Sequence, residues 1–209
     1  MSDPSPRSAA SYRLLVLGFE NVSDNSYTGP LRHKGFPMSR KPIIGVIGGG
    51  TTASEEGLRL AEEVGFLIAR EDAILACGGL NGVMAAAAKG AKRGDGLTLG
   101  ILPSGNKADA NPYIDIPVAT AMSTARNLVI VRTADALIAI NGSYGTLSEI
   151  AHALDLGKTV FALRTWSMEK LGVEGELFAP VSTPREAVDR AIKFARKAMA
   201  AETPSGYVK

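Results

Sequence analysis

The residues best suited to chemistry lie in one short stretch, Asn141-Gly142-Ser143-Tyr144-Gly145-Thr146-Leu147-Ser148-Glu149, between an apolar run and a predicted helix. Its glycines allow the backbone to turn sharply and to approach a ligand closely. Amides at the start of a helix, aided by the helix dipole, attract anions. We therefore predict a phosphate site formed by Asn141, Gly142, Ser143, Tyr144, Gly145 and Thr146.

Glu149 places a carboxylate next to this predicted anion site. The segment Thr146-Leu147-Ser148-Glu149 matches the capping box, in which the Glu side chain bonds back to an amide at the helix start. Alternatively, the carboxylate acts as an acid, a base or a cation stabiliser on a sugar attached to the phosphate. The residues themselves leave both roles open.

Two other glycine loops follow predicted strands, and their ligand candidates are Gly48, Gly49 and Gly50 in the first and Gly78, Gly79, Asn81 and Gly82 in the second. Each loop alone would be explained as a tight turn. In an open parallel sheet, however, ligands bind beyond the carboxyl ends of the strands near the topological switch point. Three glycine loops at three strand ends therefore favour one shared ligand site.

A further predicted helix starts with Ser123-Thr124-Ala125-Arg126. Ser123 offers a hydroxyl group, and the guanidinium of Arg126 can hold a phosphate through two hydrogen bonds. The alternative role for Arg126 is a surface salt bridge. We predict that Ser123 and Arg126 assist the anion site.

Two common nucleotide-binding patterns are not supported. Gly48, Gly50 and Ala53 fit G-x-G-x-x-A, but the second strand ends in Ala76-Cys77-Gly78, without the acid that would hold a ribose. The segment from Gly100 to Gly105 is followed by Asn106 where a Walker motif needs Lys. The sequence therefore argues against a dehydrogenase and a P-loop NTPase.

The elements that must position these residues alternate between short apolar strands and helices. Strands are predicted at 43–47, 73–76, 97–102, 114–118, 136–140, 159–163 and 177–181, and helices at 54–69, 81–93, 123–133, 146–156 and 184–200. Strands that are apolar on both faces and separated by helices indicate a mostly parallel sheet covered on both sides. The predicted fold class is α/β, a doubly wound Rossmann-like domain.

Composition sets the remaining expectations. A chain of 209 residues with 45% hydrophobic residues can bury one core, so we predict a flexible extension at 1–37, one domain at 38–202 and a tail at 203–209. A net charge of +2 without a basic run argues against a nucleic-acid partner. Cys77 is the single cysteine and His33 and His152 are the two histidines, so neither a disulfide nor a metal site is expected. No apolar run reaches the ~18 residues of a membrane span, which predicts a soluble, cytoplasmic protein.

The stretch from Gly142 to Glu149 resembles the Pro-Gly-Gly-x-Gly-Thr-x-x-Glu signature of the LONELY GUY family, once mislabelled as lysine decarboxylases. The resemblance extends from Ile43 to about Leu163 and is strongest toward the branch that includes the molybdenum cofactor carrier proteins. In the hydrolases of this family, cytokinin riboside 5'-monophosphate phosphoribohydrolases, the catalytic pair matches Arg126 and Glu149. The chain departs from them at Asn127, where they have Lys, and at Asn141 and Ser143, which replace Pro and Gly.

Three functions follow from this resemblance. A carrier would bind molybdopterin-type cofactor by its phosphate and release it intact, so the cofactor is a cargo and no resident cofactor is required. A hydrolase would cleave a nucleoside 5'-monophosphate to free base and ribose 5-phosphate, and a sensor would bind a nucleotide without chemistry. We favour the carrier, and the resemblance also implies a homodimer or a higher assembly of dimers.

Overall fold

The structure, a computed structural model, describes residues 40–168, 175 and 177–201. The predicted extension at 1–37 and the tail at 203–209 lie outside these residues. The described part contains a sheet of seven parallel strands in the order β4-β3-β2-β1-β5-β6-β7. The strands are β1 (Ile43–Gly48), β2 (Ile74–Cys77), β3 (Thr98–Leu102), β4 (Ile116–Ala119), β5 (Ala136–Ile140), β6 (Val160–Leu163) and β7 (Phe178–Val181).

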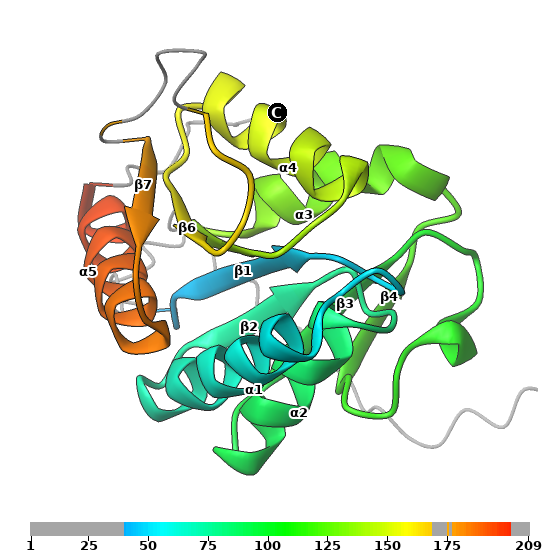
Figure 1. Cartoon of the computed structure of the whole chain (residues 1–209). Coiled ribbons are helices and arrows are strands. Elements are labelled where there is room, and N and C mark those ends of the chain that lie inside the picture. The colour runs from blue at the N-terminus through cyan, green and yellow to red at the C-terminus, as the bar shows by residue number, and fades with distance from the viewer. Residues whose placement is uncertain (1–39, 169–174, 176, 202–209) are drawn as a thin grey trace, which may run out of the picture. The chain divides into compact units, whose positions relative to one another are not determined.

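Helices alternate with the strands, as predicted (Figure 1). They are α1 (Glu55–Arg70), α2 (Val83–Arg93), α3 (Asn127–Thr133), α4 (Tyr144–Asp155) and α5 (Pro184–Ala201), with short 3-10 helices η1 (Lys107–Asp109) and η2 (Ser123–Arg126). The doubly wound α/β class is therefore confirmed. The predicted helix at 123–133 is divided into η2 and α3, and α4 starts two residues before its predicted start at Thr146.

Two helix starts follow directly from local sequence. The Ser54 hydroxyl accepts a hydrogen bond from the Gly57 amide at 3.1 Å at the start of α1. At the start of α5, the Thr183 hydroxyl accepts from the Glu186 amide at 3.2 Å. Side-chain oxygens before a helix satisfy amides that have no partner within it. Both helix starts are local signals that do not depend on the rest of the fold.

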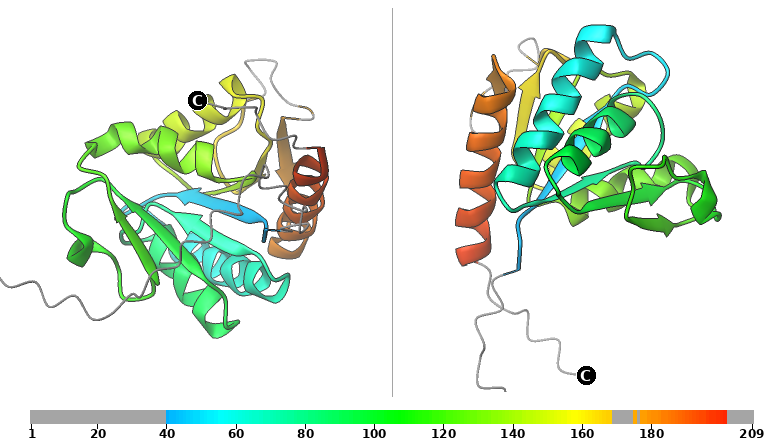
Figure 2. Two further views of the ribbon diagram at one scale, coloured as in Figure 1. Left: turned by 180° about the vertical axis from the view of Figure 1, so that it is seen from behind. Right: turned by 90° about the horizontal axis from the view of Figure 1, so that it is seen from below.

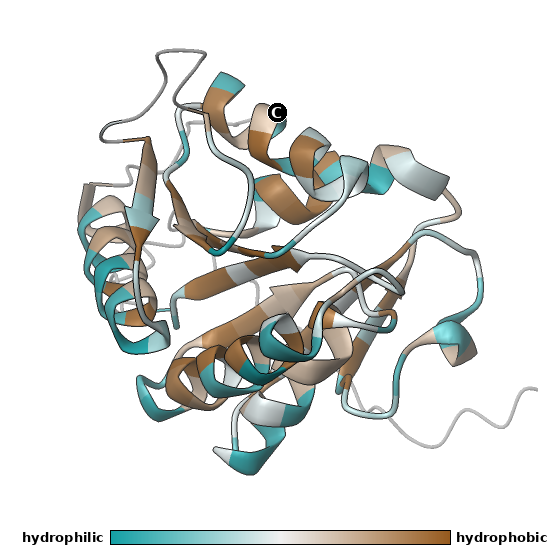
Figure 3. Ribbon diagram, viewed as in Figure 1, coloured by the Kyte–Doolittle hydropathy of each residue, from teal (hydrophilic) through white to brown (hydrophobic). Residues whose placement is uncertain are grey.

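The helices cover both faces of the sheet (Figures 1 and 2). α1, α2 and α5 enclose one apolar cluster with β1 and β2, and α3 and α4 enclose the other with β5 and β6. The apolar residues of the helices face the strands and their polar residues face outward (Figure 3). Every residue of β5 is buried, because helices cover both of its faces.

The chain order reverses at β1, which pairs with β2 on one side and with β5 on the other. Strands β2, β3 and β4 follow outward on the first side, and β6 and β7 on the second. This is the topological switch point at which an open parallel sheet binds its ligands. The loops after β1, β2 and β5 all leave the sheet at this edge.

Candidate anion-binding site

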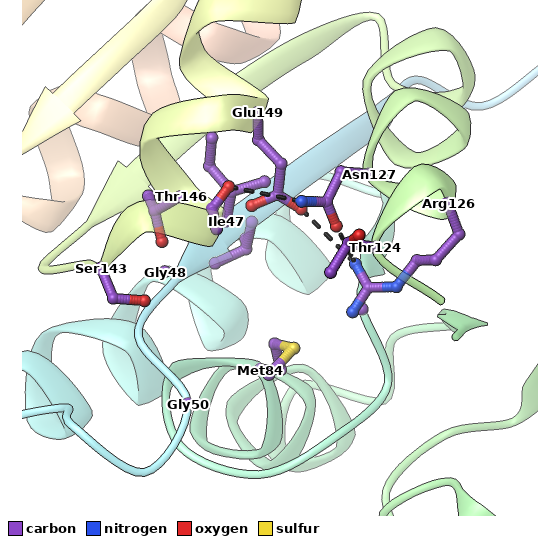
Figure 4. Close-up of a pocket in the computed structure, with 13 residues that line it drawn as sticks. Ile47, Gly48, Gly50, Met84, Thr124, Arg126, Asn127, Ser143, Thr146 and Glu149 are labelled. Atoms are coloured by element: carbon purple, nitrogen blue, oxygen red, sulfur yellow. Dashed lines mark hydrogen bonds and ion pairs between the residues drawn. The ribbon is translucent and has the colours of Figure 1, made fainter. Parts of the chain in front are cut away.

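A pocket of about 200 Å³ lies at the switch point, beyond the carboxyl ends of β1, β2 and β5 (Figure 4). In the close-up, Glu149 and Thr146 of α4 lie on one side, Arg126 and Thr124 of η2 lie across from them, and Met84 of α2 lies below. The complete lining comprises Val46, Ile47, Gly48, Gly50, Gly78, Met84, Thr124, Arg126, Asn127, Ser143, Gly145, Thr146 and Glu149.

Two glycines are needed for the close approach of backbone and side chains around this pocket. A Cβ on Gly48 would lie 2.4 Å from the Ile140 carbonyl oxygen and 2.5 Å from a Val83 methyl group. A Cβ on Gly78 would lie 2.5 Å from Nη2 of Arg126. Real Cβ atoms do not approach other atoms so closely. Gly78 therefore makes room for the Arg126 guanidinium.

The backbone conformation of the turn before α4 accommodates the serine that replaces a signature glycine. Ser143 has φ −124° and ψ −164°, an extended conformation that any residue adopts, so its Cβ causes no strain. The left-handed conformations fall instead on Asn141 (φ 55°) and Gly142 (φ 132°). Asn is one of the few residues that tolerates this region. The replacement of Gly by Ser in the signature therefore carries no backbone cost here.

The start of α4 presents unbonded donors to the pocket. Ser143 is the N-cap residue, and its side chain makes no capping hydrogen bond. The first amides of an α-helix have no partner within the helix, so they are available to an anion. The Thr146 hydroxyl is buried, its residue only 1% exposed, and it has no hydrogen-bond partner.

Glu149 does not cap the helix. Because α4 starts at Tyr144, Glu149 is its sixth residue, whereas a capping carboxylate belongs at the third. The capping-box hypothesis is therefore wrong. The carboxylate instead lies at the pocket, where its Oε1 atom is 3.5 Å from Nη1 of Arg126.

Arg126 and Glu149 form a buried pair, with 8% and 6% of each residue exposed. Asn127 completes the arrangement. Its Oδ1 accepts a hydrogen bond from Nη1 of Arg126 at 3.1 Å, and its Nδ2 donates to the Ser148 hydroxyl at 2.8 Å. Asn127 thereby links η2 to the first turns of α4 across the pocket. The surface salt bridge considered for Arg126 is excluded, because the ion pair is buried.

Burial controls the charge of this pair. It raises the pKa of the Glu149 carboxyl to about 7, because the attraction of Arg126 only partly offsets the loss of hydration. Burial also lowers the pKa of the Arg126 guanidinium, which nevertheless stays charged. A carboxyl that titrates near neutral pH can both donate and accept a proton, so the pocket contains a suitable general acid or base.

The donors without partners indicate that the pocket is built for a ligand. Among the described residues, two buried side-chain polar atoms lack a hydrogen bond, Nε of Arg126 and Oγ1 of Thr146. An unsatisfied buried polar group is costly and rare in native proteins. Both residues line the same pocket. An anionic acceptor in this pocket would satisfy both atoms.

The structure brings about half of the predicted site residues to the pocket, namely Gly48, Gly50, Gly78, Arg126, Ser143, Gly145, Thr146 and Glu149. The others, Gly49, Gly79, Asn81, Gly82, Ser123, Asn141, Gly142 and Tyr144, do not line it. Some of them support its walls. The Gly49 carbonyl accepts a hydrogen bond from the Val83 amide at 2.9 Å, and the Gly79 carbonyl accepts from the Asn111 amide at 2.8 Å.

Sequence reasoning missed five lining residues: Val46, Ile47, Met84, Thr124 and Asn127. Val46 and Ile47 carry no sequence signal of a ligand site, because apolar residues at the end of a strand are typical of the hydrophobic core. Asn127 had a signal, since it replaces the Lys of the hydrolase signature and directly follows Arg126.

The described residues show neither a metal cluster nor a membrane span. Groups of three or more metal-ligating side chains do not occur among these residues. Of the helices in residues 40–168 and 177–201, none is both long and apolar enough to cross a bilayer.

Comparisons with known proteins show what this chain resembles. The family model of the SLOG cluster4 family matches residues 41–189. An uncharacterised protein of Archaeoglobus fulgidus is 47% identical over 154 residues, which cover 74% of this chain and 97% of that protein. The family match and the two structures below confirm the resemblance to the LONELY GUY-like superfamily and its molybdenum cofactor carrier branch.

Two solved structures are similar over nearly their whole length. The molybdenum cofactor binding protein of the phototrophic bacterium Rippkaea orientalis is 37% identical with a TM-score of 0.70, over 78% of this chain and 99% of that one. The molybdenum cofactor carrier protein of Chlamydomonas reinhardtii is 34% identical with a TM-score of 0.70, over 76% of this chain and 99% of that one.

Proposed function

Because the chain belongs to the SLOG cluster4 family, we propose that it binds a phosphorylated, nucleotide-like molecule and acts as a carrier of molybdenum cofactor. The identity of this cargo is supported by the two similar structures, whose names state that they bind or carry the cofactor. The cofactor is a cargo, so the carrier needs no resident cofactor. Its phosphate would lie at the start of α4.

One observation carries the binding proposal: the unsatisfied side-chain atoms belong to Arg126 and Thr146, which line one pocket together with the start of α4, whose N-cap makes no side-chain capping bond. A phosphate accepts hydrogen bonds from all of these donors at once. The pocket of about 200 Å³ is smaller than the roughly 300–1,000 Å³ of sites that enclose a drug-sized ligand. It therefore suits the phosphate end of a molecule whose remainder extends out of the pocket.

The carrier is favoured over the hydrolase by Asn127. The resembling enzymes have a second cation at this position, whereas Asn127 is a neutral side chain that is hydrogen-bonded on both sides of the pocket. Loss of a cation weakens the electrostatic stabilisation of charge that develops during bond cleavage. Binding of a phosphate by Arg126 and the α4 amides does not require that cation.

The alternative hydrolase has its own support in Glu149, a buried carboxyl with a raised pKa about 3.5 Å from Arg126. In that reaction, water would add to the sugar carbon of a nucleoside monophosphate, and the N-glycosidic bond would break. The base leaves with one proton, and ribose 5-phosphate keeps the hydroxyl group. Glu149 would stabilise the oxocarbenium-like transition state or transfer the proton.

Incubation of the purified protein with AMP distinguishes the two functions. The carrier proposal predicts binding without release of adenine or ribose 5-phosphate. It also predicts a fluorescent oxidised pterin in protein purified from cells that make the cofactor. Adenine release that is lost in Glu149→Gln and retained in Glu55→Gln, an exposed carboxylate at the start of α1, would instead establish the hydrolase.

A nucleotide sensor would bind AMP without turnover and would contain no pterin, so the pterin measurement separates it from the carrier.

We further propose that the protein is a cytoplasmic homodimer without a nucleic-acid partner. The low net charge of +2 supports the last point. Sedimentation of the purified protein, alone and with duplex DNA, tests both the dimer and the absent partner.

A further inference from the structure

A second hollow of about 270 Å³ lies beside the turn that precedes α4. It is lined by Asn141 and Gly142 from the turn and by Arg164, Thr165 and Trp166 from the segment that follows β6. Because β5 and β6 are parallel neighbours, their carboxyl ends lie at the same edge of the sheet. The second hollow therefore opens at the edge of the sheet that carries the anion pocket.

Two large aromatic side chains meet beside this hollow. The rings of Tyr144 and Trp166 have centroids 6.3 Å apart and are tilted by 33°. Tyr144 is 82% exposed and Trp166 is 37% exposed, although aromatic residues make up only 6% of the chain. Exposed aromatic surface next to a polar pocket is typical of a ligand contact.

The aromatic pair is directly connected to the anion pocket. Tyr144 is the first residue of α4, and the next two residues of this helix, Gly145 and Thr146, line that pocket. The Trp166 indole donates a hydrogen bond to the Ser143 carbonyl at 3.3 Å, and Ser143 lines the pocket. One molecule whose phosphate lies at the start of α4 can therefore reach the two rings.

The backbone beneath the pair is held in place. The Asn141 amide donates to the Arg164 carbonyl at 3.0 Å, and the Thr165 hydroxyl donates back to the Asn141 carbonyl. Asn141 and Arg164 both adopt left-handed conformations, with φ of 55° and 53°. Non-glycine residues adopt this region rarely, and then where neighbouring contacts hold them there. The turn and the segment after β6 are thus joined by two hydrogen bonds into one platform.

Arg164 adds a cation to this platform. Its side chain is 71% exposed, and its Nε lies 3.8 Å from a Glu56 carboxylate oxygen, a long and solvated ion pair. The guanidinium is therefore available to stack on a ring or to donate to a ring carbonyl.

We infer that Tyr144, Trp166 and Arg164 form a subsite for the flat heteroaromatic ring of the ligand whose phosphate lies in the anion pocket. The inference rests on the proposed function, because it assigns a binding place to the part of the ligand that does not fit into the pocket. The ring is a pterin or a purine, both of which offer an aromatic face and hydrogen-bonding edges.

Trp166 is the single tryptophan of the chain, so its fluorescence reports on this subsite directly. Titrations with inorganic phosphate, ribose 5-phosphate, AMP and neopterin monophosphate compare the phosphate end with the whole ligand. We expect the two ring-bearing ligands to quench Trp166 and to bind at least about five-fold more tightly than ribose 5-phosphate, as stacking on aromatic side chains would produce. The tighter of the two identifies the ring as purine or pterin.

Variants at Tyr144 test the stacking without removing the hydrogen bond of Trp166. Tyr144→Ala is expected to lower the affinity for the tighter ring-bearing ligand at least about five-fold and to leave that for ribose 5-phosphate unchanged. Tyr144→Phe should keep the wild-type affinity. Ile116→Ala, an exposed apolar residue on the edge strand β4, serves as the control and should change neither affinity.

The possible results separate this inference from the function on which it rests. If ribose 5-phosphate binds but Tyr144→Ala leaves the ring-bearing ligands unaffected, the subsite is wrong and the phosphate site stands. If Tyr144→Ala changes the sedimentation mass instead of the affinity, the aromatic pair is a subunit contact and the inference is overturned. If none of the four probes binds, both the subsite and the proposed function are wrong.

Discussion

Nη1 of Arg126 lies 3.5 Å from Oε1 of Glu149, and both side chains are more than nine-tenths buried. A buried pair at this distance is electrostatically strained, because the hydration lost on burial exceeds what one ion pair returns. The raised pKa of Glu149 reflects that balance. The stability of the protein and its affinity for phosphate should therefore depend on the charges and side chains in this pocket.

The first prediction concerns stability and pH. The Glu149 pKa rises from 4.5 to about 7 on folding, so the native state binds this proton more tightly than the unfolded state. Its contribution to stability is complete below about pH 4.5 and is lost as pH rises through 7. The loss amounts to at most about 3 kcal/mol.

Glu149→Gln removes that titration. Denaturant unfolding of wild type and Glu149→Gln at several pH values should show the stability of wild type falling, relative to the variant, between about pH 4.5 and 7. The difference between the two proteins is the quantity to follow, since other groups titrate equally in both. A difference that does not change across this range would contradict the raised pKa.

The second prediction concerns the Thr146 hydroxyl, which is buried without a partner. Thr146→Val has nearly the same shape and removes the unsatisfied group, so it should stabilise the ligand-free protein by about 1 kcal/mol. The same change should weaken phosphate binding, because a donor is lost. Thermal unfolding with and without phosphate measures both effects.

A matched control for this change is available at Thr98, which is also fully buried. The Thr98 hydroxyl donates to the Tyr113 carbonyl at 2.7 Å and accepts from the Asp115 amide at 2.9 Å. Thr98→Val should therefore destabilise the protein by about 1–3 kcal/mol. If both valine variants lower stability equally, the Thr146 hydroxyl has a partner and is not awaiting a ligand.

The third prediction concerns the shape of the Arg126 side chain. Arg126→Lys keeps a positive charge near Glu149 but loses the planar guanidinium that binds phosphate through two hydrogen bonds. Affinity for ribose 5-phosphate, measured by calorimetry, should fall about tenfold or more. Arg132→Lys, an exposed position on α3, should leave it unchanged. Equal affinity in both variants would remove Arg126 from the binding site.

The fourth prediction concerns Gly78. Its added Cβ would lie 2.5 Å from Nη2 of Arg126 and 2.7 Å from the Met84 sulfur, so Gly78→Ala should displace the guanidinium. We expect a loss of stability of about 1–3 kcal/mol together with weaker phosphate binding.

Gly145→Ala is the matched comparison for stability. An added Cβ there has no other atom within 4 Å, and the residue lies in α4. Alanine should therefore stabilise the helix by up to about 1 kcal/mol. Melting temperatures of the two variants should move in opposite directions. A melting temperature of Gly78→Ala that does not fall would show that Gly78 does not make room for Arg126.

Local signals in the sequence determined the order of strands and helices and the α/β class. Apolar runs such as 136–140 mark buried strands wherever they occur, and the cap before Pro184 marks the start of a helix without any distant contact. The strand ends also indicated that three glycine loops would meet at one edge. Rules of chain connection, which hold for any parallel sheet, were sufficient for that conclusion.

Only the tertiary structure decided what Glu149, Asn127 and Thr146 do. Because α4 starts two residues before its predicted start, Glu149 lies at the pocket and not at a capping position. The local sequence did not specify this earlier start. Asn127 bonds to Arg126 and to Ser148, and the ring of Tyr144 contacts the ring of Trp166. These contacts depend on how α3, α4 and the segment after β6 pack together. Burial and hydrogen-bond partners are properties of that packing, so the sequence alone could name these residues but not their partners.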